Sequence, residues 1–434
     1  MVFLMMSPRF YIETFGCQMN VHDSEKIAGV LAREGYCSTC DPRKADIIIY
    51  NTCSIREKAE QKFYSELGRV KSLKRKRPDL KIAVAGCIAQ QQGRGVFRRA
   101  PHVDLVFGPQ NIHLLNDLLR GGSQAVADED NPLIADMDLP VVRKPGGRAW
   151  VSIMYGCNNF CSYCIVPYTR GRERSRPTEN ILKEISELGR DGYREVILLG
   201  QNVNSYKSDT DFAGLLRKIN SVRWIERIRF VTSHPRDLSD GLASAFEELP
   251  KVCEHLHLPL QSGSSRILDL MNRGYTFDEY KEIVTKLRKK IKGLSFTTDI
   301  ITGFPGETEE DHEDTLKALK KLEFDGIFAF KYSPRPGTVA TLMDSKVDDA
   351  VASRRLTEIL DLQDSITLKK NRSYEGTYQE ILVEGPSESD SELLTGRTRT
   401  NKIVNFRGRD GQTGSFARVR IVEGRRHSLL GSLM

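Results

Sequence analysis

Three cysteines, Cys157, Cys161 and Cys164, stand within one stretch of eight residues. Three thiolates at this C-x3-C-x2-C spacing can surround one compact site for a soft metal. A structural zinc site is usually closed by four ligands, and no nearby Cys or His completes such a set. A [4Fe-4S] cluster held by only three thiolates keeps one iron open for a small molecule. The spacing therefore favours an iron–sulfur cluster over a zinc knuckle with a distant fourth ligand.

A second set of cysteines, Cys17, Cys53 and Cys87, shares one sequence context, because each follows a predicted strand by a few residues. Their separations of 36 and 34 residues correspond to one β/α unit each. The carboxyl ends of parallel strands form the ligand crevice of an open sheet, so the three thiols are expected to converge there. Gly16 and Gly86 would let the backbone approach closely. Three converging thiols can bind a second cluster; the alternative is three ordinary buried cysteines.

The other three cysteines fit neither set. Cys37 and Cys40 form a C-x-x-C pair at the expected end of a helix rather than after a strand. This pair could take part in redox or metal chemistry. The simpler interpretation is that the two cysteines have no special function. Cys253 is expected to be a structural residue. Together with the two triads, these make nine cysteines, which in a reducing compartment indicates metal ligation rather than disulfides.

The chain of 434 residues is long enough for two or three domains. The first, at 8–122, alternates strands and helices and is expected to be a doubly wound α/β domain. Its strands are predicted at 9–14, 46–50 and 81–85, and its helices at 24–34, capped by Asp23 or Ser24, and 55–73. No Gly-x-Gly-x-x-Gly follows a strand, so a dinucleotide site is not expected. Gly, Asp and Pro residues mark 123–147 as a linker.

The central region, 148–370, is expected to be a partial (β/α)6 barrel. Its six strands are predicted at 150–154, 195–199, 227–231, 255–259, 295–300 and 326–330. The tail, 371–434, instead has short strands separated by Gly-rich turns, predicted at 379–383, 393–398, 403–406 and 416–421. That pattern is typical of a small all-β barrel of the OB type.

Charge indicates the class of partner. The chain carries a net charge of +7, and from Thr395 to Met434 nine Arg or Lys residues face two acids. A basic terminal module suggests an acidic polymer, most simply nucleic acid. No run of about 18 apolar residues predicts a membrane span, and no signal peptide is recognised between Met1 and Phe10. We therefore expect a cytoplasmic protein, and nothing demands more than a monomer.

Longer motifs resemble the methylthiotransferase family of radical S-adenosylmethionine (SAM) enzymes over nearly the whole chain. The matching segments are Thr14-Phe-Gly-Cys-Gln-Met-Asn20, Asn51-Thr-Cys-Ser-Ile-Arg-Glu57, Ala85-Gly-Cys87, Gly156 to Arg172, His257-Leu-Pro-Leu-Gln-Ser-Gly-Ser264 and Thr298-Asp-Ile-Ile-Thr-Gly-Phe-Pro-Gly-Glu307. The tail resembles a TRAM domain, the RNA-binding barrel of this family. Thr14 to Asn20 and three other segments resemble the branch that acts on isopentenyl-adenosine beside the anticodon: Cys53-Ser-Ile-Arg-Glu-Lys-Ala59, Tyr332-Ser-Pro-Arg-Pro-Gly-Thr338 and Thr398-Arg-Thr-Asn-Lys-Ile-Val404.

This resemblance implies methylthiolation of C2 of N6-isopentenyladenosine at tRNA position 37. It implies two [4Fe-4S] clusters, one on Cys157, Cys161 and Cys164, which cleaves SAM, and one on the other triad, which holds the sulfur. Two SAM molecules are consumed per turnover, one as methyl donor and one as radical source. The C2–H bond is unactivated, so hydrogen-atom abstraction by a cofactor-derived radical suits it better than a protein base. The implied partners are tRNA and an electron donor of flavodoxin or ferredoxin type.

Candidate contacts for SAM and RNA follow from the same resemblance. Side chains at the carboxyl ends of barrel strands are expected to bind SAM: Gln201, Asn202, Ser233, Gln261 and Asp299, with Tyr163 beside the adenine. His234 accompanies Ser233 after the third strand. Basic and aromatic side chains are expected to contact RNA through phosphates and stacked bases: Arg170, Arg172, Arg397, Arg399, Lys402 and Phe406.

Two other functions remain compatible with the motifs. One is a methylthiotransferase acting on a ribosomal protein or on threonylcarbamoyl-adenosine in tRNA. The other is an RNA-binding iron–sulfur protein that is not an enzyme. The two cysteine triads argue against it, because each would leave one iron of its cluster without a protein ligand.

Overall fold

The computed structural model describes residues 7–54, 57–121, 124–143, 145–388, 390–409 and 411–434. Within these ranges the chain divides into two compact units. The first comprises Met1–Lys144, Tyr155–Asn158 and Ile165–Arg174, and the second comprises Pro145–Met154, Asn159–Cys164 and Ser175–Met434. The predicted helix over 55–73 and the predicted linker over 123–147 each begin at residues outside the described ranges.

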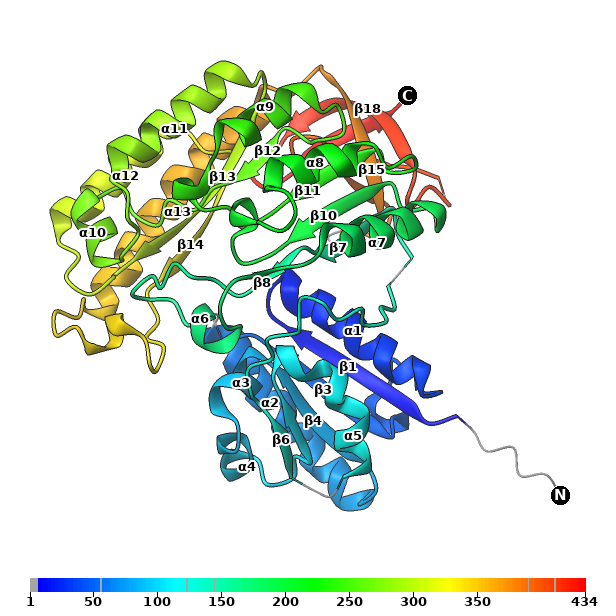
Figure 1. The fold of residues 1–434 in the computed structure, drawn as a ribbon. Coiled ribbons are helices and arrows are strands. Elements are labelled where there is room, and N and C mark those ends of the chain that lie inside the picture. Colours follow the sequence, from blue (N-terminus) through cyan, green and yellow to red (C-terminus); the bar gives the residue numbers. More distant parts are fainter. Residues whose placement is uncertain (1–6, 55–56, 122–123, 144, 389, 410) are drawn as a thin grey trace. The chain divides into compact units, whose positions relative to one another are not determined.

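The first unit is built on a six-stranded, fully parallel sheet of order β2-β1-β3-β4-β5-β6 (Figure 1). The strands are β1 (Arg9–Phe15), β2 (Cys37–Ser38), β3 (Ile47–Thr52), β4 (Lys81–Gly86), β5 (Leu105–Phe107) and β6 (Ala125–Ala127). The strand order reverses between β1 and β3, which makes that point the topological switch of a doubly wound sheet. The predicted α/β fold of this domain is confirmed.

Helices cover both faces of this sheet. The α-helices are α1 (Gln18–Arg33), α2 (Glu57–Lys76), α3 (Cys87–Gln92), α4 (Gly95–Arg99) and α5 (Leu115–Arg120). Two separate hydrophobic clusters result, one with Phe63, Leu67 and Phe97 and the other with Ile27 and Leu31. Apolar side chains of the central strands therefore point to both sides of the sheet, which explains the continuous apolar run of β3.

Three local predictions were wrong in this unit. Helix α1 begins at Gln18, capped by Cys17 and Asn20, rather than at Asp23 or Ser24. Cys37 lies in the edge strand β2, not at a helix end. Strand β6 pairs with β5 inside the segment that was predicted to be a linker.

The second unit contains a partial barrel of two three-stranded parallel sheets, β11-β10-β7 and β12-β13-β14. A bridge between Ile228 and Val252 continues the hydrogen bonding from β11 toward β12. The strands are β7 (Arg148–Ser152), β10 (Glu195–Leu199), β11 (Arg227–Phe230), β12 (His255–His257), β13 (Ser295–Thr302) and β14 (Gly326–Lys331). They confirm the six predicted barrel strands; β8 (Met154–Tyr155) and β9 (Arg174–Ser175) pair separately.

Helices line the outside of this partial barrel (Figure 1). They are α7 (Thr178–Arg190), α8 (Phe212–Asn220), α9 (Asp240–Glu248), α10 (Ser265–Leu270), α11 (Phe277–Lys290), α12 (Glu309–Leu322) and α13 (Asp349–Arg372), and the short α6 (Val166–Thr169) belongs to the first unit. Their apolar faces pack on outward-facing strand residues such as Leu198, Phe230 and Phe296 in one large core. Across the described residues, no helix is long and apolar enough to cross a membrane.

The tail of the second unit forms a closed five-stranded barrel of order β15-β16-β17-β19-β18. Its strands are β15 (Tyr378–Pro386), β16 (Leu394–Thr398), β17 (Ile403–Arg407), β18 (Phe416–Gly424) and β19 (Leu429–Leu433), of which β19 was not predicted. Alternate residues of β17 point inward, so Val404 and Phe406 are fully buried in the barrel core.

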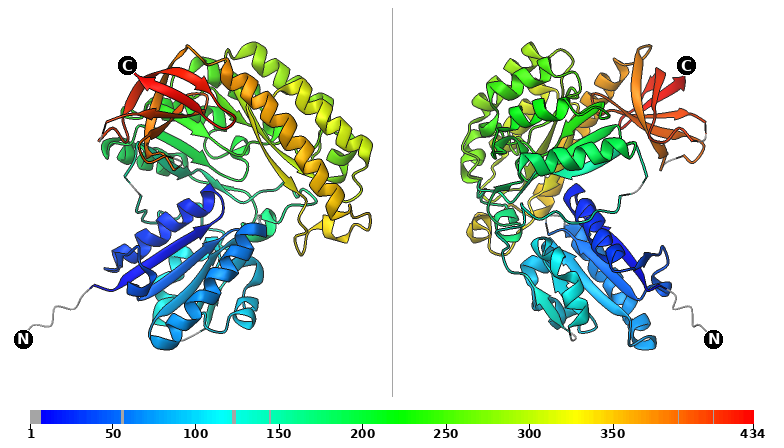
Figure 2. Two further views of the ribbon diagram at one scale, coloured as in Figure 1. Left: turned by 180° about the vertical axis from the view of Figure 1, so that it is seen from behind. Right: turned by 45° about the vertical axis from the view of Figure 1, so that its right-hand side comes forward.

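This tail barrel packs against residues at the amino ends of the partial-barrel strands (Figure 2). Arg227 and Arg229 of β11 donate to backbone carbonyls of the tail, including those of Arg397 and Thr398. Arg399 of the tail pairs with Glu254 at 2.7 Å. Charged groups, rather than an apolar seam, therefore fix the tail in place.

Asp325, just before β14, is a largely buried acid of this interface. It pairs with Lys370 at 2.8 Å and Lys402 at 3.2 Å, and all three side chains are largely buried. Removing one member of a buried ion pair leaves an uncompensated charge and costs about 3–5 kcal/mol. We therefore expect Asp325→Asn to lower the free energy of unfolding by about 3–5 kcal/mol in urea denaturation.

A matched control is Glu392→Gln, which removes an acid whose partner Arg407 lies 3.7 Å away with both side chains mostly exposed. Exposed pairs contribute roughly 0–1 kcal/mol. An equal decrease in the free energy of unfolding of the two variants would contradict a role for the Asp325 ion pairs in holding the tail.

Candidate metal centres and cofactor site

The three N-terminal cysteines meet at the carboxyl edge of the first sheet, as the sequence predicted. Cys17 follows β1 and caps α1, Cys53 follows β3, and Cys87 is the first residue of α3 after β4. Because β1, β3 and β4 are neighbours in the sheet, these positions are adjacent. The thiol of Cys53 shares side-chain hydrogen bonds with both Cys17 and Cys87. The triad therefore lies beside the topological switch point, where such folds bind ligands.

Glycine permits this close approach at two positions. Gly86 has a φ of +89°, and a β-carbon there would lie 2.4 Å from the side-chain oxygen of Asn51. A β-carbon on Gly16 would lie 2.6 Å from the β-carbon of Cys53. A larger residue at either position would push the strand ends apart, so these glycines are needed for the triad to assemble.

A buried guanidinium faces the same triad. Arg170 was predicted to contact RNA, but it is buried and pairs with Asp23 at 2.7 Å. Its positive charge helps to lower the pKa of the Cys17 and Cys87 thiols. The RNA role predicted for Arg170 is therefore wrong in this structure, and the side chain instead supplies positive charge where thiolates gather.

The pKa of Cys17 is lowered to about 6, chiefly by the hydrogen bond from Cys53, against the opposing effect of burial. Cys53 keeps its proton because its own pKa is raised. Thiolate, not thiol, reacts with iodoacetamide. In cluster-free protein we expect alkylation of Cys17 to rise around pH 6, well below the value of about 8.5 for a free thiol, as measured by peptide mass spectrometry.

Arg170→Gln should move that midpoint upward, because it removes one of the lowering charges. Arg172→Gln, which keeps Arg170, is the matched control. An unchanged Cys17 profile in Arg170→Gln would contradict the electrostatic role.

The C-x3-C-x2-C segment is divided between the two units. Cys157 belongs to the first, where its backbone N–H donates to the carbonyl of Gly171. Cys161 and Cys164 belong to the second, where a backbone hydrogen bond joins them in a tight turn. Ser162 anchors that turn, since its N–H donates to Met271 and its hydroxyl to Leu270.

A residue that the sequence did not single out, Arg273, contacts this turn. Its Nη1 lies 3.3 Å from Sγ of Cys161, its Nε donates to the hydroxyl of Tyr275, and its Nη2 donates to the carbonyl of Pro259. Nη1 also lies 3.5 Å from the hydroxyl of Tyr163. The guanidinium is buried, and no carboxylate partner is found for it among the described residues. A lone buried cation beside a metal-ligand candidate indicates that negative charge belongs there.

Unpartnered polar atoms gather after three barrel strands. Among the described residues, no hydrogen-bond partner is found for Oε1 of Gln201, Oδ1 of Asn202, Oγ of Ser233, Nε2 of His234 and Oε1 of Gln261. Buried polar groups almost always find a partner, so these atoms fit a bound polar molecule. Its position at the strand carboxyl ends agrees with the site predicted for SAM.

His234 is a neutral donor in this group. Burial first, and then the charges of Arg273 and Arg236, lower its pKa to about 2. Its Nδ1 accepts the backbone N–H of Arg236, so Nε2 carries the proton and points a donor at the site. Asp299, also predicted here, instead accepts from Nε2 of His257 at 3.3 Å.

The structure does not support the four predicted RNA contacts in the tail. Phe406 is fully buried and cannot stack on a base. Arg397 lies 3.0 Å from Glu384, Arg399 pairs with Glu254, and Lys402 pairs with Asp325. These side chains hold the tail barrel rather than present charge to solvent. Of the predicted basic contacts, Arg172 is exposed.

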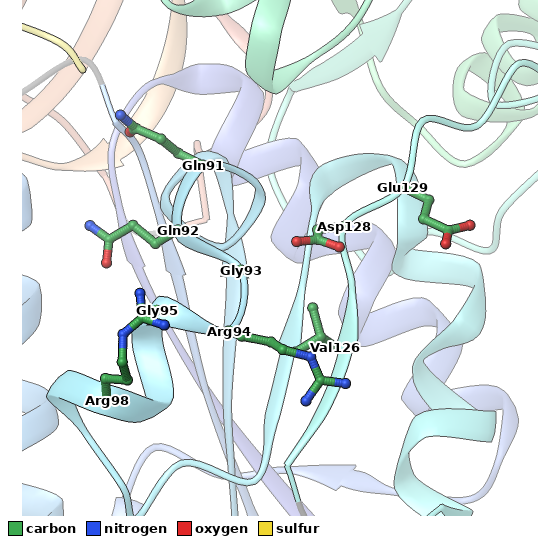
Figure 3. Close-up of a pocket in the computed structure, with 9 residues that line it drawn as sticks. All are labelled: Gln91, Gln92, Gly93, Arg94, Gly95, Arg98, Val126, Asp128 and Glu129. Atoms are coloured by element: carbon green, nitrogen blue, oxygen red, sulfur yellow. The ribbon is translucent and has the colours of Figure 1, made fainter. Parts of the chain in front are cut away.

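One open hollow of about 540 Å³ lies in the first unit (Figure 3). It is lined by residues at the end of α3, the start of α4 and the end of β6, including Arg94, Arg98, Asp128 and Glu129. Its lining is polar and of mixed charge, and it contains none of the predicted site residues.

Comparison with known proteins assigns the domains. The chain matches the Radical SAM superfamily over residues 151–319, Uncharacterized protein family UPF0004 over 9–108, and the TRAM domain over 372–434. It is 52% identical over 426 residues to the tRNA-2-methylthio-N(6)-dimethylallyladenosine synthase of Thermodesulfovibrio yellowstonii, covering 98% of both chains. The chain belongs to this synthase family. The synthase of Carboxydothermus hydrogenoformans is 49% identical and is covered completely.

Solved structures resemble the synthase fold at low identity. The radical SAM methyltransferase TsrM of Kitasatospora setae, with cobalamin and a [4Fe-4S] cluster bound, aligns with a TM-score of 0.59 and 15% identity over 77% of each chain. That likeness supports the fold alone. The radical SAM domain at 151–319 supports the use of an iron–sulfur cluster and SAM.

The cysteine triads of this synthase offer thiols of the kind that bind iron–sulfur clusters. Among the described residues, no three Cys, His, Asp or Glu side chains are arranged to hold one metal ion. A [4Fe-4S] cluster makes no such demand, because each thiolate binds a different iron. A buried guanidinium accompanies each triad, Arg170 near Cys17 and Cys87 and Arg273 beside Cys161, and this positive charge fits an anionic iron–sulfur cluster.

Proposed function

We propose that this protein methylthiolates C2 of N6-isopentenyladenosine at position 37 of tRNA, consuming two SAM molecules per turnover. The observation that carries the proposal is the presence of two separate cysteine triads, each with a buried arginine associated with it, in a chain about half identical to curated synthases. A sulfur donor and a radical source are different chemical tasks, and two triads provide a place for each.

In this proposal Cys157, Cys161 and Cys164 hold one [4Fe-4S] cluster, and Cys17, Cys53 and Cys87 hold the other. When bound, the clusters supply reductive cleavage of SAM and a site for the sulfur that is transferred. The protein's own contribution is positioning. Atoms of Gln201, Ser233 and Gln261 that are unpartnered among the described residues orient SAM, and the neutral His234 donates a hydrogen bond to it.

The tRNA contacts are proposed on a different face of the tail barrel from the one predicted. Strand β18 presents Arg418 and Arg420 outward, and the guanidinium of Arg418 lies 5.3 Å from the ring centre of the half-exposed Tyr378. Cations beside an exposed aromatic ring suit phosphate attraction and base stacking. Arg397, Arg399 and Lys402 are engaged within the protein, whereas Arg418 and Arg420 are exposed on this face.

The test uses anaerobically reconstituted protein, SAM and a reductant, with two substrates offered in parallel. One is tRNA bearing isopentenyladenosine, and the other is ribosomal protein. We expect the tRNA nucleoside to gain a methylthio group in place of one hydrogen, with no mass change in the ribosomal protein. Modification of the ribosomal protein alone would overturn the assignment of substrate.

Iron content tests the two-cluster part separately. Reconstituted wild type should contain about eight irons, and a Cys157/Cys161/Cys164→Ala triple variant about four, as expected for two cysteine-ligated [4Fe-4S] sites. About four irons falling to none would mean that the N-terminal triad holds no cluster.

A further inference from the structure

Two aromatic side chains stand exposed on the inner face of the partial barrel. In the parallel pairing of β13 with β14, Phe328 is in register with Asp299 and Phe330 with Ile301. Residues in register on neighbouring parallel strands share a face of the sheet. The alternate residues, Ile327 and Ala329, pack against the helix-covered core. Phe328 and Phe330 therefore point to the concave side, away from the helices.

These rings lack the burial that aromatic side chains usually gain. Phe328 is 53% exposed and Phe330 is 41% exposed. Neighbouring exposed apolar side chains inside a concave surface are typical of a ligand-binding wall. A single exposed aromatic ring on a protein surface needs no explanation. Two exposed rings at successive inward-facing positions of one strand do need one.

The wall has a polar border on the next strands. The His257 ring lies 5.9 Å from that of Phe328 in an edge-on arrangement. His257 is itself held by Thr297 at 3.0 Å and Asp299 at 3.3 Å. The surface thus combines flat apolar rings with fixed hydrogen-bonding groups. A purine has the matching character, with an apolar face and a polar edge.

The wall reaches the level along the strands at which Gln261 lies. The backbone N–H of Gln261 donates to the carbonyl of Asp299, and that of Ile301 donates to the carbonyl of Gln261, while Phe328 and Phe330 are in register with the same two residues of β13. A molecule on the wall would therefore lie at the same end of the strands as the molecule proposed to bind there. That neighbourhood is what a hydrogen-atom transfer between the two requires.

We propose that Phe328 and Phe330 form the apolar wall that receives the prenylated adenine of the tRNA, against its ring and its dimethylallyl group. This inference rests on the proposed function and adds the residues that select the prenylated base. The target adenine must leave the stacked anticodon loop to reach the barrel, and an aromatic wall compensates for the stacking that it loses. The branched five-carbon group adds apolar surface that an unmodified adenine lacks.

The experiment compares two anticodon stem-loop RNAs, one with N6-dimethylallyladenosine and one with adenosine at the same position. Binding is measured by fluorescence anisotropy on reconstituted holoprotein with SAM and without reductant, so no turnover occurs. Wild type should prefer the prenylated RNA. Phe328→Ala and Phe330→Ala should each reduce that preference at least about tenfold, the size expected for a lost apolar contact, with little change for unmodified RNA.

Leu342→Ala is the matched control, because Leu342 is 83% exposed and lies in the short 3-10 helix Val339–Leu342 rather than on the inner face. Phe330→Leu keeps apolar surface and should retain part of the preference. Unchanged preference in both alanine variants would overturn the inference. So would weaker SAM binding with RNA preference intact, which would assign the wall to SAM.

Failure of the proposed function gives a different pattern. If wild type neither prefers the prenylated RNA nor methylthiolates it, the proposed substrate is wrong. If wild type does both and the alanine variants behave like wild type, only the role of Phe328 and Phe330 is wrong.

Discussion

Replacing Cys53 by alanine is expected to abolish methylthiolation of tRNA while leaving reductive SAM cleavage intact. Cys53 is buried at the centre of the N-terminal triad, and its thiol shares hydrogen bonds with both Cys17 and Cys87. Its loss removes a proposed cluster ligand. Even partners outside the first ligand shell commonly change metal affinity or activity 10–100-fold, so we expect loss of product by more than about 100-fold.

Two products separate the two triads in this experiment. Methylthiolated nucleoside and 5'-deoxyadenosine are quantified from the same reaction by mass spectrometry. The methylthiolated nucleoside should disappear and 5'-deoxyadenosine should still form, because the proposed ligands of the SAM-cleaving cluster, Cys157, Cys161 and Cys164, are all unaltered.

Cys253→Ala is the matched control, since Cys253 is also buried and free but belongs to neither triad. This variant should still form both the methylthiolated nucleoside and 5'-deoxyadenosine. Methylthiolation retained by Cys53→Ala would show that the N-terminal triad is not the source of the transferred sulfur.

The convergence of Cys17, Cys53 and Cys87 could be predicted from the sequence because it depends on local rules. Each cysteine follows a strand, and neighbouring parallel strands end at one edge. The barrel strands were predictable for a similar reason, since their apolar runs and spacing are visible in short windows. Strand β6 was missed because three small residues, Ala125–Ala127, carry little signal of their own.

The roles of the arginines could not be predicted, because they depend on partners distant in the chain. Arg170 lies in a run of alternating arginines, yet its partner Asp23 is 147 residues away. Arg399 pairs across 145 residues with Glu254. Phe406 is a different case, because the alternation of apolar and polar residues in Val404-Asn405-Phe406-Arg407 is visible in the sequence. That alternation predicts that the ring points into the barrel, as the structure shows.

Replacing Arg273 by methionine is expected to make the SAM-cleaving centre harder to reduce. Its Nη1 lies 3.3 Å from Sγ of Cys161, so its charge and N–H group act on a proposed cluster ligand. Hydrogen bonds to the sulfurs and the net charge around a cluster set its reduction potential. Removing a buried positive charge favours the oxidised, less negative state, and the midpoint potential should fall.

The expected loss in 5'-deoxyadenosine formation is about 10–100-fold, the range for groups that support metal ligands from outside. An electron paramagnetic resonance redox titration measures the potential independently of turnover. Arg273→Lys retains the charge but not the planar fork that also donates to Tyr275 and Pro259. Arg273→Lys should therefore have a midpoint potential close to that of wild type, but it should form 5'-deoxyadenosine at only part of the wild-type rate.

These two readouts distinguish electrostatic tuning from mere support of the fold. A buried guanidinium that only held Tyr275 and Pro259 in place would, when replaced, lower thermal stability and iron content without moving the potential of the clusters that still form. An unchanged midpoint potential in Arg273→Met would therefore contradict the tuning role. A fall in Arg273→Met that Arg273→Lys reverses would assign the effect to the positive charge beside Cys161.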